Sequence, residues 1–258
     1  DVRIWTDDRD GGYISQGEYG GSQFVRDMLP RWMQTPWGEC YELANEPPCN
    51  DGNALARLRD YSIGAMREAS ARGIRLCILN LPEGNPGADG GLQDEAARAS
   101  ERWKLQQLVP AVKLACELGH YVGMHCYWKP GVEGPLGRWH ALGRIVWDVE
   151  QWRQMGVDVS RLKLLINEAG IDGLVAGGAR AGWQSLNPGG YVGEVVELER
   201  KARELPWLHA LMLFTCGYEP PWADYDHTEA LCAQLAPALR SVTVPEPPKE
   251  EPVKPEPT

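Results

Sequence analysis

Two glutamates, Glu46 and Glu168, each follow an asparagine at the end of a run of strand-forming residues. The first stands in "YELANEPP", residues 41–48, and the second in "LKLLINEAG", residues 162–170. The start of a loop with solvated polar side chains explains one such Asn-Glu pair as well as a catalytic site does. A second instance favours a catalytic site. Two carboxyl groups in one site can divide the work, because one stays protonated as an acid while the other stays ionised as a base or nucleophile.

The elements that must position these glutamates are short, mostly apolar runs separated by helical patterns. Alternating β and α predicts a parallel sheet with crossover helices, and the spacing of the runs favours an α/β fold of the TIM (β/α)8-type barrel. A doubly wound sheet is the competitor, but no glycine-rich phosphate loop follows any run. The predicted strands are 39–44, 74–79, 121–127, 162–166 and 208–214, with "VRIW" (2–5) as a further candidate.

Helices are predicted wherever apolar residues recur at spacings of three and four. Gly73, Gly119 and Gly156 follow three of these patterns at the position that a C-cap favours. Pro110 predicts a kink or the start of a new helix within the second pattern. The predicted helices are 53–72, 97–118, 139–155, 193–205 and 228–240.

Composition excludes several function classes. The 258 residues carry a formal net charge of −10 and no Lys/Arg-rich block, so we expect no nucleic-acid partner. No segment is apolar enough to predict a membrane span, and no signal peptide is visible. We expect one barrel domain over 1–242, followed by a proline-rich charged linker over 243–258 that leads to further domains.

The seven cysteines lie mostly in apolar runs and are interpreted as small buried hydrophobes. Cys40 and Cys49 flank the first Asn-Glu pair, and a disulfide between them is one alternative. No Cys or His spacing typical of a zinc site appears. We therefore predict neither a metal nor another cofactor.

The aromatic residues are unusual, with 11 Trp and nine Tyr against two Phe. Trp and Tyr combine a flat apolar face with a polar handle, which suits a half-wet sugar-binding cleft. Trp128 and Trp222, each just past a predicted strand, are candidate sugar platforms, although packing between helices and sheet is nearly as good an explanation.

The ordered set "ELANEP", "HCY" and "INEAG" resembles the large clan of retaining glycoside hydrolases, which includes cellulases and β-glycosidases. That clan has a (β/α)8 barrel with catalytic glutamates at the ends of strands four and seven. The resemblance covers roughly 2–222 and implies that Glu46 is the acid/base and Glu168 the nucleophile. Because only "VRIW" precedes strand four on this count, the chain is expected to lack the first two βα units, and the clan's strand-two arginine cannot be assigned.

The resemblance also implies roles for neighbouring residues. Asn45 is expected to hydrogen-bond the sugar 2-hydroxyl, and His125 and Tyr127 are expected to contact substrate and orient the nucleophile. His125 and Tyr127 lie two residues apart and so on one face of their strand. Asn80 is expected to line the cleft from strand five, whereas Glu83 is interpreted as a loop carboxylate.

Three functions remain open from sequence. The favoured one is retaining hydrolysis of β-glycosidic bonds in a polysaccharide or oligosaccharide, with a secreted or cell-surface location. A catalytically inactive carbohydrate- or cell-wall-binding barrel is the alternative. The third is metal-dependent hydrolysis using His125, His227 and nearby carboxylates, although the spacing of Asp224, Asp226 and His227 fits a solvated loop or substrate contacts better.

Overall fold

The computed structural model of the chain contains a five-stranded parallel sheet. It describes residues 10–36, 38–84, 94–137, 140–216 and 222–243. Neighbouring strands pair in chain order, and every pairing is parallel. The five strands predicted from 39 onward are therefore confirmed, as β1 (Tyr41–Glu42), β2 (Leu76–Leu81), β3 (Tyr121–Trp128), β4 (Leu164–Ile171) and β5 (Leu208–Leu213).

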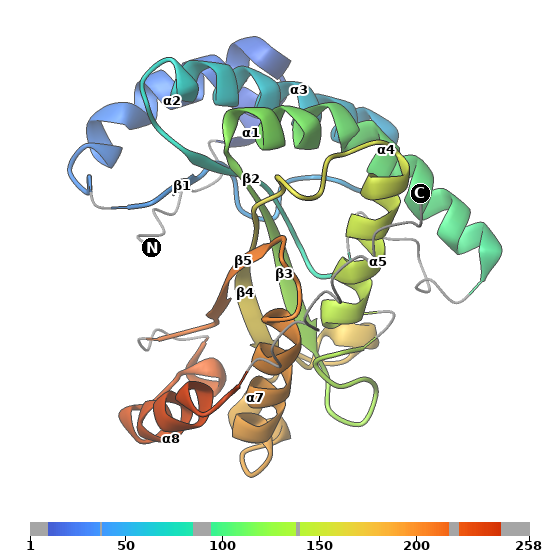
Figure 1. The fold of residues 1–258 in the computed structure, drawn as a ribbon, viewed down its shortest axis with the longest axis vertical. Helices are drawn as coiled ribbons and strands as arrows, with labels where there is room; N and C mark the ends of the chain where they lie inside the picture. Colours follow the sequence, from blue (N-terminus) through green and yellow to red (C-terminus); the bar gives the residue numbers. More distant parts are fainter. Residues whose placement is uncertain (1–9, 37, 85–93, 138–139, 217–221, 244–258) are drawn as a thin grey trace, which may run out of the picture.

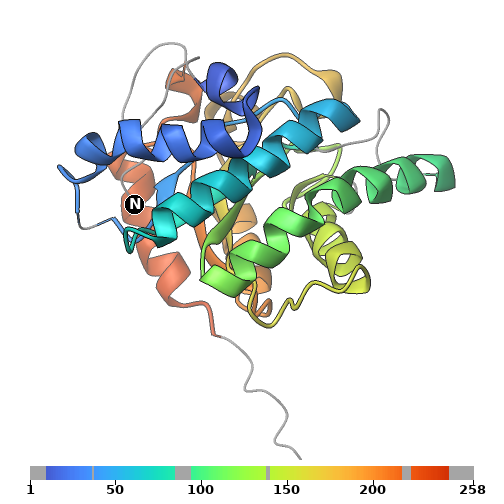
Figure 2. The same ribbon diagram turned by 90° about the horizontal axis from the view of Figure 1, so that it is seen from above.

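Helices form an arc around this sheet, from α2 and α3 past α4 and α5 to α7 and α8 (Figure 1). The five predicted helices are all present: α3 (Gly52–Ser70), α4 (Glu95–Leu118), α5 (Ala141–Gln154), α7 (Tyr191–Ala202) and α8 (Glu229–Arg240). The sequence analysis missed the short α6 (Trp183–Leu186) and the N-terminal α1 (Asp10–Ile14) and α2 (Gly17–Trp32). Helix α2 runs beside α3 in both views and packs against it (Figure 2).

Local signals explain where the helices begin and end. Asp51 caps α3, since its carboxylate accepts hydrogen bonds from the backbone amides of Asn53 and Ala54. Asp94 caps α4 in the same way, and Gly119 closes it in the left-handed conformation at φ 77°. Helix α4 runs through Pro110, so the predicted start of a new helix there is wrong.

The core has two layers, one on each side of the sheet. The larger lies between the outer sheet face and the helices, where apolar stripes such as Leu55, Leu58 and Leu105 pack. A smaller cluster of Cys40, Cys77, Tyr121 and Leu165 lies on the inner face. Strands β2, β3 and β4 are buried throughout, which explains why their sequences do not alternate.

Strand β5 is only half-buried along its length and forms one edge of the described sheet. The described strands therefore form an α/β half-barrel rather than a closed (β/α)8 barrel. The predicted strand at 2–5 and most of the predicted linker, 244–258, lie outside the described residues, so the division at 242 stays a prediction.

All seven cysteines are free thiols, so no disulfide joins Cys40 and Cys49. Both side chains are buried, and burial raises the pKa of each thiol to about 12. Within the described part of the chain, none of the helices has the length and apolar character needed to span a bilayer.

Candidate functional site

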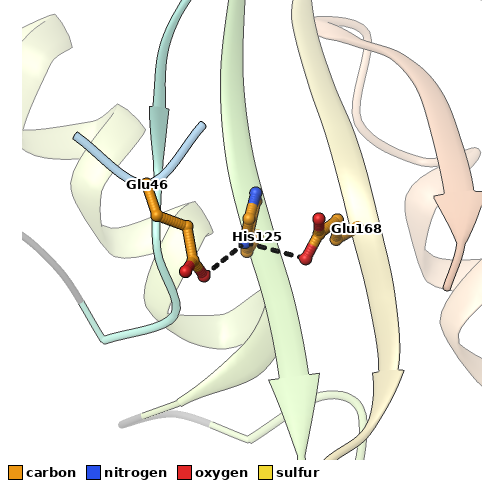
Figure 3. A group of neighbouring side chains, drawn as sticks. All are labelled: Glu46, His125 and Glu168. Atoms are coloured by element: carbon orange, nitrogen blue, oxygen red, sulfur yellow. Dashed lines mark hydrogen bonds and ion pairs between the residues drawn. The ribbon is translucent and has the colours of Figure 1, made fainter. Parts of the chain in front are cut away.

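The structure brings Glu46, His125 and Glu168 together (Figure 3). Glu46 follows β1, whereas His125 in β3 and Glu168 in β4 are register partners in the sheet. The Nδ1 atom of His125 lies 3.1 Å from Oε1 of Glu46 and 3.2 Å from Oε2 of Glu168. Because an ionised carboxylate only accepts hydrogen bonds, the tautomer that fits both partners carries its hydrogen on Nδ1. The two glutamates thus face a common imidazole.

The two carboxylates differ in their access to solvent. One oxygen of Glu46 and one of Glu168 lie within 4.8 Å of each other. The Glu46 side chain is 49% exposed, whereas that of Glu168 is 8% exposed and the His125 side chain is fully buried. One carboxyl group therefore stands at the rim, where a ligand can exchange with water, and the other lies at the base.

The backbone at Glu46 is not extended, although a residue that precedes a proline, as Glu46 precedes Pro47, favours the extended region. Its φ of 44° places the residue in the left-handed region, which costs a non-glycine residue about 1 kcal/mol or more. Its amide donates a 3.2 Å hydrogen bond to the carbonyl oxygen of Asn80 at the end of β2. This contact and the bond to His125 hold Glu46 in that conformation.

Tyr127 orients the buried glutamate. Its hydroxyl donates a 2.7 Å hydrogen bond to Oε2 of Glu168, the oxygen that also faces His125. The Tyr127 ring contacts His125 and Phe214 edge-on. Since His125 and Tyr127 lie on one face of β3, a single strand presents to Oε2 of Glu168 a hydroxyl that donates a hydrogen bond and an imidazole nitrogen 3.2 Å away.

Asn80 does not line the cleft, contrary to expectation. It is completely buried, and two successive residues with positive φ, Leu79 and Asn80, turn it toward the sheet interior. Its side-chain amide donates a 2.5 Å hydrogen bond to the carbonyl oxygen of Ala44. Its oxygen accepts a 3.1 Å hydrogen bond from Asn167, which also donates a 2.6 Å bond to Glu42.

We call the hydrogen bonds that Asn80 and Asn167 make with Ala44, Glu42 and each other the interior amide bridge. This bridge connects β1, β2 and β4 beneath the site. The bridge crosses over β3 at Gly123, where a Cβ atom would lie 1.9 Å from the side-chain oxygen of Asn80. Asn167 directly precedes Glu168, and Ala44 lies two residues before Glu46. The bridge therefore fixes the two segments that present the glutamates. The asparagines of the two Asn-Glu pairs have different roles, because Asn45 faces the cleft, whereas Asn167 faces the interior.

A pocket of about 140 Å³ opens at the same strand ends. Five of the predicted site residues line it: Asn45, Glu46, Tyr127, Glu168 and Trp222. The other five lining residues were not predicted from the sequence: Asp172, Leu174, Arg180, Phe214 and Tyr225. Asp172 and Phe214 directly follow β4 and β5, and this position is a signal that could have found them, because residues at the carboxyl ends of barrel strands line the cleft.

Trp222 is placed to offer an aromatic face in this pocket. It contacts Phe214 and Tyr225 edge-on, and the guanidinium of Arg180 lies 4.5 Å from the centre of its ring. Trp128, in contrast, is not a platform. It is fully buried, stacks against Tyr191 and donates a 2.7 Å hydrogen bond from its indole nitrogen to Glu194.

The Asp224–His227 segment braces the fold. Asp224 accepts hydrogen bonds from the backbone of Gly182 and the hydroxyl of Ser185. Both ring nitrogens of His227 have partners, the carbonyl oxygen of Thr215 at 2.7 Å and the hydroxyl of Tyr191 at 2.8 Å. His227 therefore has no nitrogen available for a metal.

Among the residues that the structure describes, one group has donor atoms close enough for a cation: Glu46, His125 and Glu168. One imidazole nitrogen and two carboxylate oxygens form a donor set that zinc accepts. The same three groups are also paired with one another, so the arrangement is complete without an ion.

Glu83 is more than a loop carboxylate. It accepts hydrogen bonds from the backbone amides of Tyr127 at 2.7 Å and Ala141 at 3.1 Å. Burial raises the pKa of Glu83 to about 7, against the lowering effect of these two amides and the nearby Arg144.

No protein-family model matches the chain, and no curated protein matches it. Among solved structures it is similar to a GH5-4 broad specificity endoglucanase from an uncultured bacterium, with a TM-score of 0.50 and 14% identity over 91% of this chain and 63% of that one. A tri-modular endo-β-1,4-glucanase B from Bacillus halodurans matches with a TM-score of 0.48 and 13% identity, over 88% of this chain and 40% of that one.

The chain thus spans less than two thirds of the length of either structure. At 14% identity the first match shows the fold alone. The chain therefore has an α/β half-barrel fold that is similar to part of this endoglucanase structure.

Proposed function

We propose that the protein is a retaining glycoside hydrolase that cleaves β-glycosidic bonds by double displacement. One observation carries this proposal: Glu46, which follows β1, and Glu168, which lies within β4, place carboxylate oxygens within 4.8 Å of each other across one pocket. Retaining enzymes hold their two carboxyl groups about 5–5.5 Å apart, whereas inverting enzymes need about 6.5–9.5 Å to admit a water. The shorter separation favours the retaining mechanism.

In the first step, Glu168 attacks the anomeric carbon while the glycosidic C–O bond breaks. Glu46 gives its proton to the departing oxygen, which would otherwise be a poor leaving group. The exposed position of Glu46 suits exchange of the leaving group, and the Tyr127 hydroxyl and the nearby His125 imidazole suit an anionic nucleophile at Glu168.

In the second step, Glu46 takes a proton from water as that water attacks the same carbon. The bond from sugar to Glu168 breaks, and the carboxylate is regenerated. Asn45 lines the pocket where the expected hydrogen bond to the sugar 2-hydroxyl would form, and Trp222 supplies the aromatic face.

The substrate class is a β-linked polysaccharide or oligosaccharide. Because the GH5-4 structure is an endoglucanase, β-glucans are the first substrates to test. A carbohydrate substrate also favours export from the cell or attachment to its surface.

Hydrolysis of an activated aryl β-glycoside tests the proposal. Glu168→Gln should abolish turnover, because the nucleophile is lost. Glu46→Gln should slow hydrolysis of the aryl glycoside, and added azide should restore turnover as a β-glycosyl azide, since azide needs no general base. Glu150→Gln is the matched control, because Glu150 is a glutamate on α5 that pairs with Arg153 outside the pocket.

Full activity of Glu168→Gln would reject the nucleophile role. An α-configured first product from the wild-type protein, seen by NMR, would reject the retaining mechanism. Calorimetric binding of a β-glucan without any turnover would favour the alternative, a carbohydrate-binding barrel.

A further inference from the structure

Glu83 accepts a backbone hydrogen bond from β3 beyond the last residue that pairs with β2, where β4 alone still pairs with β3. The last register pair between β2 and β3 joins Leu81 to Met124, three residues before Tyr127. Beyond that pair, the amide of Tyr127 needs another acceptor, because a backbone N–H that is buried without one destabilises the fold. Oε2 of Glu83, two residues past the end of β2, accepts this hydrogen bond at 2.7 Å.

The second oxygen of the same carboxylate holds the start of α5. Oε1 accepts a 3.1 Å hydrogen bond from the amide of Ala141, the first residue of that helix. The N-cap residue, His140, makes no side-chain capping bond, and Ala141 has a φ of 53°. Glu83 thus supplies from another segment a carboxylate contact at a helix N-terminus, which attracts negative charge.

Charged and titratable groups face Glu83 from both elements. Arg144 on the next turn of α5 and His125 on β3 interact electrostatically with Glu83 and lower its pKa, whereas the charge of Glu83 raises the pKa of Cys126. Arg144 is already engaged by Glu101 and Asp148. Burying a carboxylate in such surroundings costs less free energy when both of its oxygens accept hydrogen bonds, as they do in Glu83.

We propose that Glu83 is a positioning residue that fixes the backbone of Tyr127 and thereby holds the Tyr127 hydroxyl against Glu168. The backbone amide of Tyr127 donates a hydrogen bond to Glu83, and the side-chain hydroxyl of the same residue donates one to Oε2 of Glu168. The Glu83 carboxylate thus connects the loop after β2, the end of β3 and the start of α5. The consequence for turnover rests on the proposed glycosidase function, whereas the consequence for geometry does not.

Hydrogen exchange on Glu83→Gln tests the geometry. Glutamine has one acceptor oxygen, and its NH2 group would face an amide N–H that it cannot accept from. We expect the Tyr127 amide to exchange about tenfold faster or more, as loss of a charge-assisted hydrogen bond implies. A crystal structure of the variant should show the Tyr127 hydroxyl beyond hydrogen-bond distance of Glu168.

Glu133→Gln is the matched control. Glu133 accepts a 3.0 Å hydrogen bond from the amide of His140, next to the start of α5, but makes no contact with Tyr127 that the structure describes. This variant should leave the Tyr127 amide and hydroxyl as they are. If Glu83→Gln does not fold, Glu83→Asp serves instead, because its shorter side chain reaches at most one of the two amides.

The kinetic readout separates positioning from general stability. Glu83→Gln should lower kcat about tenfold with KM within twofold of wild type, because Asn45 and Trp222, the proposed substrate contacts, are unchanged while the nucleophile loses orientation. Unchanged protection of Tyr127 and an unchanged Tyr127–Glu168 contact in the folded variant would overturn the proposal. If the wild-type protein hydrolyses no glycoside, the proposed function fails, yet the exchange and crystallographic results still decide the role of Glu83.

Discussion

The Tyr127 hydroxyl and the His125 imidazole converge on the same oxygen of Glu168, at 2.7 Å and 3.2 Å. Both side chains stand on one face of β3, and Glu168 is the register partner of His125 on β4. The orientation of the proposed nucleophile is therefore set by the neighbouring strand, and substitutions on β3 test it without touching the carboxylate.

Tyr127→Phe should lower kcat about 10- to 100-fold, because a hydrogen bond to a charged group contributes about 1.5–3 kcal/mol. The ring still packs edge-on against Phe214, so the melting temperature should change little. Steady-state kinetics on an aryl β-glycoside, with calorimetry of folding alongside, check this. An unchanged kcat would show that the hydroxyl does not serve Glu168.

Gly123→Ala should break the interior amide bridge. The new Cβ would meet the side-chain oxygen of Asn80 at 1.9 Å, so Asn80 or Asn167 must move and a buried amide loses its partner. We expect the free energy of unfolding to fall by about 2–4 kcal/mol, together with a loss of turnover. Denaturant titration measures the first and aryl glycoside hydrolysis the second.

Gly193→Ala is the control for that variant. Gly193 lies in α7 with open space around its Cβ position, so alanine should raise the free energy of unfolding by about 0.5–1 kcal/mol. Equal effects of the two substitutions would argue against the bridge.

Substitutions of Trp222 and Trp128 should have different effects, because we expect Trp222 to bind substrate and Trp128 to stabilise the fold. Trp222→Ala should raise KM or weaken oligosaccharide binding about tenfold, with a small change in stability, because the indole lines the pocket. Trp128→Phe should instead lower stability by about 1–3 kcal/mol, since Glu194 loses its indole donor in a buried site. Calorimetric titration and thermal melts distinguish the two, and weakened binding in Trp128→Phe alone would reverse the assignment.

Stability should fall as pH rises from 6.5 to 8. Burial, followed by the negative charge of Asp148, raises the pKa of Glu101 to about 8, although Arg144 pairs with both. A carboxyl group with a raised folded pKa holds its proton more tightly when folded, so its contribution is lost between pH 4.5 and 8. Burial lowers the pKa of His120 to about 4, so His120 makes stability rise with pH instead. That contribution is complete at about pH 6.5, the ordinary pKa of histidine.

Thermal melts across this range check the sign. The wild-type melting temperature should drop between pH 6.5 and 8, and Glu101→Gln should flatten the drop because Gln does not titrate. A steeper drop in Glu101→Gln would assign the pH dependence to another group.

Chelators should leave turnover unchanged. The double-displacement mechanism needs only carboxyl groups and water, and His227, the second histidine of the metal-dependent hypothesis, uses both ring nitrogens within the fold. Activity of the protein after dialysis against EDTA measures this, with readdition of zinc as the second arm. Loss on dialysis and recovery with zinc would favour the group Glu46, His125 and Glu168 as a metal site.

Much of the fold could be predicted because the signals are local. Apolar runs without alternation identify strands covered on both faces, and caps such as Asp51 and Gly119 mark helix ends. The N-terminal helices escaped because α2 carries three glycines, which weaken any helical pattern. Glu46 and Glu168 stood out because a repeated polar pair after an apolar run predicts two side chains at one edge of the sheet.

The roles of individual polar residues were decided by tertiary structure. Asn80 lies near the end of β2 and Glu83 just after it, yet Asn80 turns into the sheet interior and Glu83 reaches the backbone of β3 and α5. Trp128 ends β3 and Trp222 lies beyond β5, yet only Trp222 lines the pocket. Nothing in the sequence next to these residues distinguishes them.

The sequence by itself determined which segments become strands and which carboxylates stand at their ends, because periodicity and termination depend on neighbouring residues. Only the tertiary structure decided that Glu46 and Glu168 share one histidine, that an amide bridge passes over Gly123, and that Glu83 supports Tyr127. The physical reason is that these contacts join residues about 40 to 120 positions apart, and their geometry depends on strand register and on two residues with positive φ at the end of β2, neither of which a local pattern encodes.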